Sequence, residues 1–230
     1  MSVMLTSHNY RTVVGRAIRS VALSEYGDHE LVIVDDASTD GSDEVIRAEL
    51  AHYPWLPVRL ITRGRNCGLA GARNLAADQA RGEYVFVLDA DNHIYPHALG
   101  RLVEAMDADP EAAFAYGILE VFTSAGPTDL KSWLDWEPER LRWGNFVDAM
   151  ALIRREALLD AGGYSEDSRL YGWEDFALWC ALADLGKRGV RVPEILAAYR
   201  SSIGSMIALT DIDASAAWSA LLERYPVLHG

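Results

Sequence analysis

The sequence is poor in cysteine, and no segment of it is both long and apolar. Its 230 residues contain only Cys67 and Cys180, which lie far apart and lack the C-x-x-C spacing of a zinc or redox site. Such sparse cysteine is typical of a reducing compartment and argues against a disulfide framework. No apolar run approaches the ~18 residues of a membrane span, and no charged-then-apolar signal segment comes before the first strand-like residues. We therefore expect a cytoplasmic protein with no integral membrane segment, whereas peripheral contact with a membrane stays open.

Positive charge is also scarce. The chain has 21 Lys and Arg residues against 34 Asp and Glu residues, which gives a formal net charge of -13 at pH 7. No run of basic residues offsets this field locally, so nucleic acid is not an expected partner. We expect a ligand that carries phosphate groups to need a metal ion here.

The hydrophobic pattern indicates an α/β fold. Half of the residues are hydrophobic, which is enough for a sizeable core in one domain over residues 1–230. Apolar runs bounded by turn residues alternate with stretches of helical periodicity, which predicts a Rossmann-like, mostly parallel central sheet flanked by helices. The first half, about 1–110, is typical of a nucleotide-binding sheet. The predicted strands are 2–7, 30–38, 58–62 and 83–91, and the predicted helices are 10–23, 38–50, 69–80 and one that starts near Trp173.

Polar groups follow three of these strands: the run from Thr6 to Asn9, the pair Asp35–Asp36, and Asp89 with Asp91 in "VFVLDADNH". Ligands of such sheets bind beyond the carboxyl ends of the strands. In extended chain, Asp89 and Asp91 face the same side and converge on one cation, whereas the adjacent Asp35 and Asp36 diverge. Two hard carboxylates suit Mg²⁺ or Mn²⁺. The alternative is that these aspartates simply end strands and start turns.

Six stretches, in order along nearly the whole chain, resemble the family 2 glycosyltransferases of the GT-A fold. These are inverting enzymes that use nucleotide-sugar donors, and the ordered set is what makes the resemblance specific. The stretches are "SVMLTSHN", "ELVIVDDASTDGS", "NCGLAGARN", "RGEYVFVLDADN", "RREALLDAGGYSED" and "GWEDFALWCALA".

The resemblance implies roles in donor binding at five positions. Thr6 and His8 match positions that cradle the donor base, and Asp36 matches the aspartate that accepts a hydrogen bond from that base. Asp89 and Asp91 match the D-x-D pair, in which the first carboxylate lies near the ribose and the second binds the metal on the diphosphate. The implied cofactor is Mn²⁺ or Mg²⁺, and the implied donor is a nucleoside-diphosphate sugar, with UDP ahead of dTDP and GDP.

The resemblance also implies an acceptor-binding half at about 111–230. Asp175 in "GWEDF" matches the catalytic base, and its neighbour Glu174 is the candidate if the two roles are exchanged. Trp173 is the candidate sugar contact beside them. The implied acceptor is a hydroxyl of a carbohydrate or a lipid-linked glycan, in surface polysaccharide or glycan synthesis. The Q-x-x-R-W signature of processive synthases is absent, which favours transfer of a single sugar.

The chain departs from the family pattern near the metal. A histidine that often assists the metal is absent from residues 199–206, and Leu5 stands where proline is common. His93 could substitute as a ligand, but we favour an ordinary surface role for it.

Two other groups of residues allow two interpretations each. Arg63, Arg65 and Arg73 surround a glycine-rich bend; they could bind a diphosphate or be ordinary solvated arginines, and only Arg73 is kept as a donor-binding candidate. Trp133, Trp136 and Trp143 suit stacking on sugar rings, but we expect them to pack in the core under a long loop.

Three rival functions stay open. The D-x-D segment also resembles that of haloacid-dehalogenase-type phosphatases, but Lys131 and Lys187, the only lysines, lack the strand-end position that this chemistry needs. A receiver-like module that binds Mg²⁺ would need such a lysine as well, and it leaves "GWEDF" without a role. The third is an inactive scaffold that keeps the glycosyltransferase fold.

Overall fold

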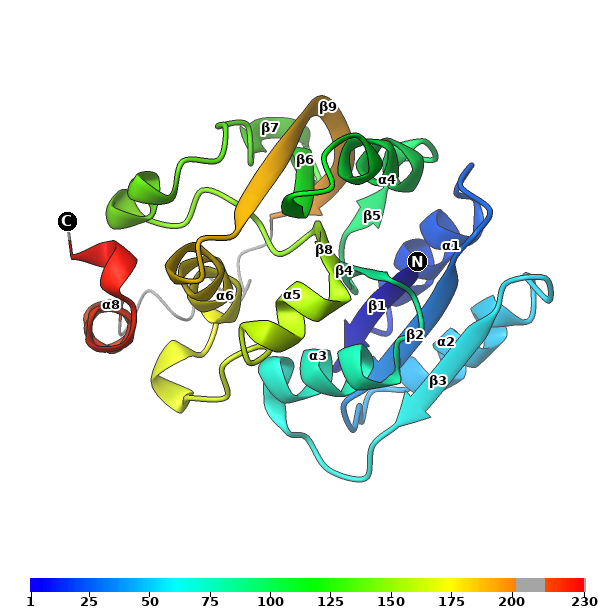
Figure 1. Cartoon of the computed structure of the whole chain (residues 1–230). Coiled ribbons are helices and arrows are strands. Elements are labelled where there is room, and N and C mark those ends of the chain that lie inside the picture. The colour runs from blue at the N-terminus through cyan, green and yellow to red at the C-terminus, as the bar shows by residue number, and fades with distance from the viewer. Residues whose placement is uncertain (202–213, 230) are drawn as a thin grey trace.

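The computed structural model, which describes residues 1–201 and 214–229, has a central sheet of nine β-strands (Figure 1). The strand order is β3-β2-β1-β4-β8-β6-β9-β5, and β7 pairs with β6 outside this row. β1 to β4 are mutually parallel, β8 is antiparallel to both of its neighbours, and β6 and β9 are parallel to each other. The strands are β1 Ser2–Ser7, β2 Glu30–Asp35, β3 Val58–Thr62, β4 Tyr84–Asp89, β5 His93–Ile94, β6 Ala112–Thr123, β7 Gly126–Lys131, β8 Ala151–Arg154 and β9 Arg188–Arg200.

Helices cover both faces of the sheet. Along β1, Val3 and Leu5 belong to one apolar cluster and Met4 to the other, because successive side chains point to opposite faces. Buried residues of α1, α2 and α4 join the first cluster, and those of α3, α5 and α6 join the second. Both faces are thus dry, which explains why the strands carry continuous apolar runs. The helices are α1 Val14–Ala22, α2 Ser42–Leu50, α3 Gly68–Gln79, α4 Ala98–Ala108, α5 Arg155–Asp160, α6 Glu174–Asp184 and α8 Ala214–Arg224.

The α/β class and the mostly parallel, helix-flanked sheet expected from the sequence are confirmed. The strands predicted at 2–7 and 58–62 match β1 and β3. The extended geometry assumed for the D-x-D pair is wrong, because β4 ends at Asp89 and the chain then turns. The N–H of Asn92 closes this turn on the carbonyl of Asp89 at 3.0 Å, so Asp91 lies in the turn and not on the strand.

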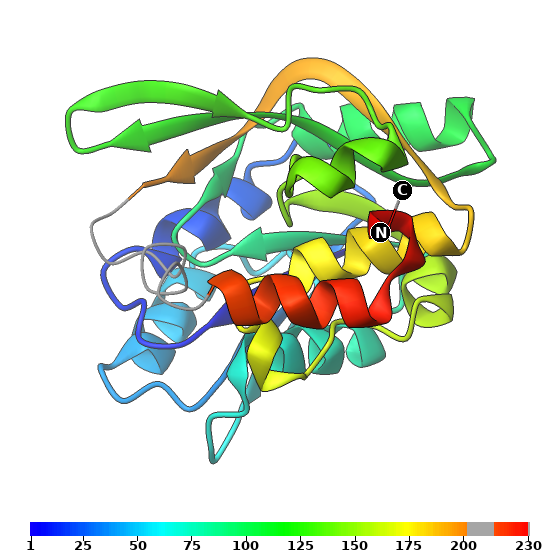
Figure 2. The same ribbon diagram turned by 90° about the vertical axis from the view of Figure 1, so that its left-hand side faces the viewer.

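The second half of the chain adds a different kind of structure. β6 and β7 form a long hairpin that projects from the body (Figure 2), and its last residue is Lys131. The expectation that neither lysine stands at a strand end is therefore wrong for Lys131. A loop with the 3-10 helix η1 Pro138–Trp143 leads to β8. The helix α5 follows β8 directly, and a second loop leads from α5 to α6. Among residues 1–201 and 214–229, no helix is long and apolar enough to cross a membrane.

Candidate active site

The carboxyl ends of β1, β2 and β4 meet at one edge of the sheet. Thr6 pairs with Asp89 across β1 and β4, and Ser7 pairs with Asp35 across β1 and β2. The register therefore brings together groups that are up to 83 residues apart in sequence (Thr6 and Asp89). The hydroxyl of Thr6 is buried and has no hydrogen-bond partner among the described residues.

The side chains of Asp35 and Asp36 diverge, as the sequence predicts. Asp35 accepts hydrogen bonds from the hydroxyl and the N–H of Ser38, which fixes the turn after β2. Asp36 points the other way and accepts from the N–H of Cys67 at 3.0 Å, with the Arg63 guanidinium 3.5 Å away. The ring of His8 contacts the same residue through its Nδ1, 2.8 Å from the Asp36 carbonyl oxygen. His8 and Asp36 thus form one hydrogen-bonded unit beside Thr6.

The D-x-D carboxylates differ in their surroundings. Asp89 accepts a 2.7 Å hydrogen bond from Nη2 of Arg73. Burial raises the pKa of Asp91 to about 6, and the negative charge of Asp89 adds to this effect. Two repelling carboxylates of this kind favour a cation between them.

The metal-binding residues of the described chain are few. No cluster of three or more His, Cys, Asp and Glu residues suited to a metal occurs in ranges 1–201 and 214–229. The ring of His93 packs edge-on against Phe122 and Tyr95, and burial lowers its pKa. Residues 202–206, part of the stretch that lacks the family's histidine, lie outside the described residues. Asp89 and Asp91 fit a hard divalent ion whose other ligands come from a diphosphate.

Arg73 is a buried residue of the site that contacts other side chains, and it is not a solvated surface residue. Its side chain is 3% exposed, it ion-pairs with Asp89, and its guanidinium lies 5.4 Å from the centroid of the Tyr164 ring. Its positive charge also counteracts the rise in the pKa of Asp175. Arg65, by contrast, is exposed. The solvated interpretation is therefore wrong for Arg73, whereas the exposure of Arg65 is compatible with both interpretations.

Asp175 and Glu174 open α6 but face different surroundings. A turn at Gly172, whose φ of 80° suits glycine, directs the chain into the helix. Glu174 is only 3% exposed, and its charge acts on Arg73. Asp175 lines a cavity, and its carboxylate accepts from the side-chain amide of Asn145 at 2.9 Å and from the N–H of Phe176 at 2.8 Å.

Burial raises the pKa of Asp175 to about 6, and the charge of Glu174 raises it further while Arg73 opposes. A carboxylate with a pKa near 6 is largely ionised at pH 7 and still takes up a proton readily, which suits a general base.

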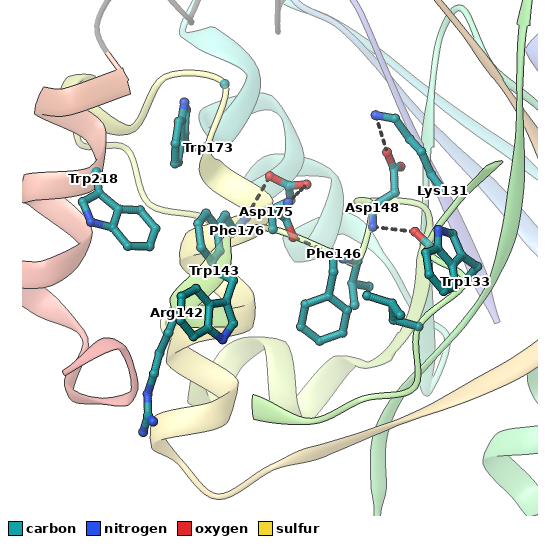
Figure 3. Close-up of a pocket in the computed structure, with 16 residues that line it drawn as sticks. Lys131, Trp133, Arg142, Trp143, Phe146, Asp148, Trp173, Asp175, Phe176 and Trp218 are labelled. Atoms are coloured by element: carbon teal, nitrogen blue, oxygen red, sulfur yellow. Dashed lines mark hydrogen bonds and ion pairs between the residues drawn. The ribbon is translucent and has the colours of Figure 1, made fainter. Parts of the chain in front are cut away.

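The cavity beside Asp175 has a volume of about 710 Å³ and aromatic walls (Figure 3). Trp173 and Trp218 lie on one side of Asp175, and Lys131, Trp133 and Asp148 lie on the other. The loop that carries Asn145 and Asp148 is anchored because the buried Trp179 donates its indole N–H to the carbonyl of Val147 at 2.8 Å. Such a mixture of broad apolar faces and a few polar groups is typical of small-molecule sites.

Of the three residues Trp133, Trp136 and Trp143, only Trp136 packs in the core. Trp136 packs against Phe114 and Phe146, as expected for a core residue. Trp133 and Trp143 are 56% and 91% exposed and line the cavity, so the expectation of core packing is wrong for both. Exposed indole faces beside a cavity provide stacking surfaces.

Asp148 is a site residue that the sequence analysis missed. Its side chain is 12% exposed, it lines the cavity with Asp175, and burial raises its pKa to about 6. No local motif marks it, because it stands in a loop whose place depends on the distant Trp179. The one available signal is a charged residue directly before the apolar run of β8.

Comparisons with known proteins identify a family for this chain. The family described as "Glycosyl transferase family 2" matches residues 2–161. The succinoglycan biosynthesis protein ExoO of Rhizobium meliloti is 30% identical over 244 residues, which cover 98% of this chain and 68% of the relative.

Two solved structures show the same fold. The mannosyltransferase PcManGT from Pyrobaculum calidifontis, in complex with GDP-Man and Mn²⁺, has a TM-score of 0.77 at 21% identity over 99% of this chain and 67% of that one. TarS 1–349 of S. aureus, in complex with UDP-GlcNAc, has a TM-score of 0.75 at 18% identity over 90% of this chain and 60% of that one. The chain thus spans about two thirds of the length of these proteins.

Proposed function

Because the chain belongs to glycosyl transferase family 2, we propose that it is an inverting enzyme that transfers one sugar from a nucleoside-diphosphate sugar to an acceptor hydroxyl. The enzyme class itself follows from the family, and it replaces the phosphatase and receiver-like alternatives. The observation that carries the proposal is the position of Asp175. It lines the aromatic cavity, and its pKa is raised to about 6.

The donor is proposed to bind at the strand ends, with its base at Thr6, His8 and Asp36. An ionised Asp36 accepts from the N3–H of uracil or thymine or from the N1–H of guanine, whereas N3 of cytosine is itself an acceptor. We place UDP first, followed by dTDP and GDP. One solved structure of the same fold holds UDP-GlcNAc and another holds GDP-Man, which supports both UDP and GDP as candidate carriers of the donor sugar.

Asp89 and Asp91 would hold Mn²⁺ or Mg²⁺, which neutralises charge on the leaving diphosphate. Arg73 keeps Asp89 in place through its 2.7 Å hydrogen bond. A rigid Asp89 then orients the donor relative to Asp175, and such orientation lowers the barrier before any proton moves.

Asp175 is proposed to remove the proton of the acceptor hydroxyl. The amide of Asn145 fixes its Oδ2, and the N–H of Phe176 fixes its Oδ1. The hydroxyl attacks the anomeric carbon from the face opposite the diphosphate, so the C–O bond to the acceptor forms as the bond to the diphosphate breaks. One base is enough, no covalent sugar–enzyme intermediate forms, and the anomeric configuration inverts.

The acceptor is proposed to be a carbohydrate or a lipid-linked glycan that enters the cavity beside Asp175. Indole rings of Trp133, Trp143, Trp173 and Trp218 offer apolar faces to sugar rings there. ExoO is named for succinoglycan biosynthesis, which supports a role of this chain in polysaccharide or glycan synthesis.

A donor screen tests the proposal. UDP-glucose, UDP-galactose, UDP-N-acetylglucosamine and GDP-mannose are added with Mn²⁺, and both the melting temperature and the release of nucleoside diphosphate are followed. We expect at least one donor to raise the melting temperature by mass action and to be turned over, with inverted product in NMR spectra. Binding without any turnover would support the inactive scaffold instead, and no nucleotide binding at all would overturn the proposal.

A further inference from the structure

We propose that Asp148 is a specificity-determining residue whose carboxylate accepts hydrogen bonds from hydroxyl groups of a sugar ring held between the D-x-D turn and Asp175. The inference rests on the proposed function and adds a recognition group to it. Neither the motifs of the sequence nor the comparisons assign a role to this residue.

The placement of Asp148 is the first support. It lies in the loop before β8, lines the same cavity as Asp175, and shares that wall with Trp133 and Phe146 (Figure 3). Its carboxyl group is within electrostatic reach of both Asp89 and Asp175. The side chain therefore lies within electrostatic range of both ends of the proposed sugar site.

The hydrogen bonds of Asp148 are the second support. Among the described residues, its carboxylate accepts one hydrogen bond, from the N–H of Met150 to Oδ1 at 3.1 Å. A carboxylate has about four acceptor sites, so most of its capacity is unused in a nearly buried place. Buried charges normally have hydrogen-bonding partners, and the exceptions need an explanation.

The neighbouring cation, Lys131, does not occupy the unused hydrogen-bond acceptor sites of Asp148. Nζ of Lys131 is 3.9 Å from Oδ2 of Asp148, beyond hydrogen-bonding distance, and it lies over the ring of Tyr199 at 3.9 Å from the centroid. The buried pair Arg73–Asp89, in contrast, is closed at 2.7 Å. Lys131 thus favours the charge on Asp148 and leaves Oδ2 without a hydrogen bond from the described residues.

Neighbouring hydroxyl groups of a hexose are the chemistry that matches this carboxylate. Each hydroxyl donates one hydrogen bond, and two of them can use two acceptor sites, while Trp133 and Phe146 supply apolar surface beside them. The ring can belong to the donor sugar or to the terminal residue of the acceptor. The chemistry is the same in both cases, and the experiment separates them.

The test compares wild-type protein with Asp148→Asn, which keeps the shape and the Oδ1 acceptor, and with Asp148→Ala. Asp129→Asn is the matched control, because Asp129 is an exposed aspartate of the adjoining β7 strand. The substrate is the nucleotide sugar of the screen above that the wild-type protein turns over fastest. UDP alone, with Mn²⁺, measures nucleotide binding.

We expect Asp148→Asn to bind UDP within about threefold of wild type and to lose roughly 10–100-fold in kcat/KM for transfer, as for the loss of a hydrogen bond to a charged group. If the hydroxyls belong to the donor sugar, its preference between UDP-glucose and UDP-galactose should also change, since a structural defect would lower both equally. If donor hydrolysis without acceptor falls in parallel, the hydroxyls belong to the donor sugar. If only the KM for acceptor rises, they belong to the acceptor. Asp129→Asn should match wild type.

Three results would overturn the inference. The first is unchanged transfer in both Asp148 variants. The second is an equal loss of UDP binding, which would indicate a folding defect. The third is a loss as large as that of Asp175→Asn, with the acidic limb of the pH profile removed, which would make Asp148 the base. A wild-type protein that binds no nucleotide instead refutes the proposed function, so the two failures are distinguishable.

Discussion

The strand-end region and the cavity region of this protein differ in how the surrounding groups stabilise their buried carboxylates. At the strand ends, Asp35, Asp36 and Asp89 each accept hydrogen bonds from nearby donors, and the site is fixed before any ligand binds. In the cavity, Asp148 and Asp175 also accept hydrogen bonds, but burial outweighs them and raises the pKa values of both to about 6. The first arrangement suits recognition of a constant nucleotide, whereas the second keeps reactive carboxylates ready for a substrate.

Asp91 is the exception that links the two regions. It belongs to the strand-end motif, yet burial and the charge of Asp89 raise its pKa as burial does for the cavity carboxylates. Carboxylates with a raised pKa are thus found in both regions. The following experiments test whether substitutions in the strand-end region change nucleotide binding and whether substitutions in the cavity change sugar transfer.

The largest effect is expected from Asp175→Asn, which removes the proton acceptor and preserves the shape. Transfer should fall by roughly 10²–10⁴, as is typical when a general base is lost, while nucleotide affinity stays within a few fold. Rates of sugar transfer and calorimetric titration with UDP and Mn²⁺ measure the two quantities. Glu174→Gln is the control and should be milder, because Glu174 does not line the cavity.

Near-normal transfer by Asp175→Asn would contradict this assignment. So would a product that keeps the anomeric configuration of the donor. A severe defect in Glu174→Gln with a mild one in Asp175→Asn would show that the two roles are exchanged.

Asp91→Asn should act in the strand-end region and change nucleotide and metal binding. We expect nucleotide affinity to fall roughly 10–100-fold, the scale of one charge-assisted interaction, and most of the dependence on Mn²⁺ or Mg²⁺ to disappear. Asp89→Asn should affect metal dependence less. It should also destabilise the fold, because it leaves the buried Arg73 without its ion pair. Calorimetry with and without metal gives the first result, and thermal unfolding gives the second. Unchanged metal dependence in Asp91→Asn would leave the D-x-D pair as turn residues only.

Nucleotide selectivity is expected to depend on the strand ends alone. UDP, dTDP and GDP should each bind roughly tenfold or more tightly than CDP, because Asp36 accepts a hydrogen bond that cytosine N3 cannot donate. Asp36→Asn should reduce this difference, and Asp175→Asn should leave it intact. Titrations in which CDP binds tightest would refute the role of Asp36.

The pH dependence of transfer should come from the cavity. Asp175 acts in its ionised form, and its pKa is about 6, so kcat/KM should be nearly constant above that value and fall about tenfold per unit below it. UDP binding measured in the same buffers separates this effect from a loss of nucleotide affinity. A rate that stays flat down to pH 4.5 would exclude Asp175 as the base.

The two regions also differ in how far the sequence could predict them. The strand ends follow from local signals, since continuous apolar runs end at Thr6, Asp35 and Asp89 and parallel strands align their carboxyl ends. The turn after Asp89 was missed, because nothing in "DAD" distinguishes a turn from continued strand. The family resemblance supplied Asp175, although its position at a helix start would not alone have shown that it is a base.

The cavity could not be assembled from local patterns. Lys131, Asn145 and Asp148 meet Asp175 because β6, β7 and β8 pair and because Trp179 holds the intervening loop. These residues line one cavity although they lie 27–44 positions away from Asp175 in sequence, and neither periodicity nor turn chemistry encodes that placement. Trp133 and Trp143 were assigned to the core for the same reason: apolar character alone does not indicate which face of a loop is covered.

The smallest expected effect is on stability, because the two cavity carboxylates should each lower the stability of the native state. The pKa of Asp148 rises from 3.8 to about 6 on folding, so the native state binds more protons than the unfolded state between these values. Stability should therefore fall as pH rises from about 4 to about 6, and the full cost persists above it. Asp148→Asn removes that cost, and we expect a melting temperature about 2–4 °C higher at pH 7.5, the change that roughly 1 kcal/mol produces in a chain of this size.

The control for this prediction has the opposite sign. Hydrogen bonds from Arg169 lower the pKa of Asp167 to about 2, so its charge stabilises the native state above pH 4 and this contribution is lost as pH falls toward 2. Asp167→Asn should thus lower the melting temperature at pH 7.5, whereas Asp148→Asn raises it. Differential scanning calorimetry at pH 4.5 and 7.5 measures both variants, and the gain of Asp148→Asn should shrink at the lower pH. If Asp148→Asn were destabilising at both values, Lys131 and the Met150 N–H would already satisfy the carboxylate, and the contrast between the two regions would be wrong.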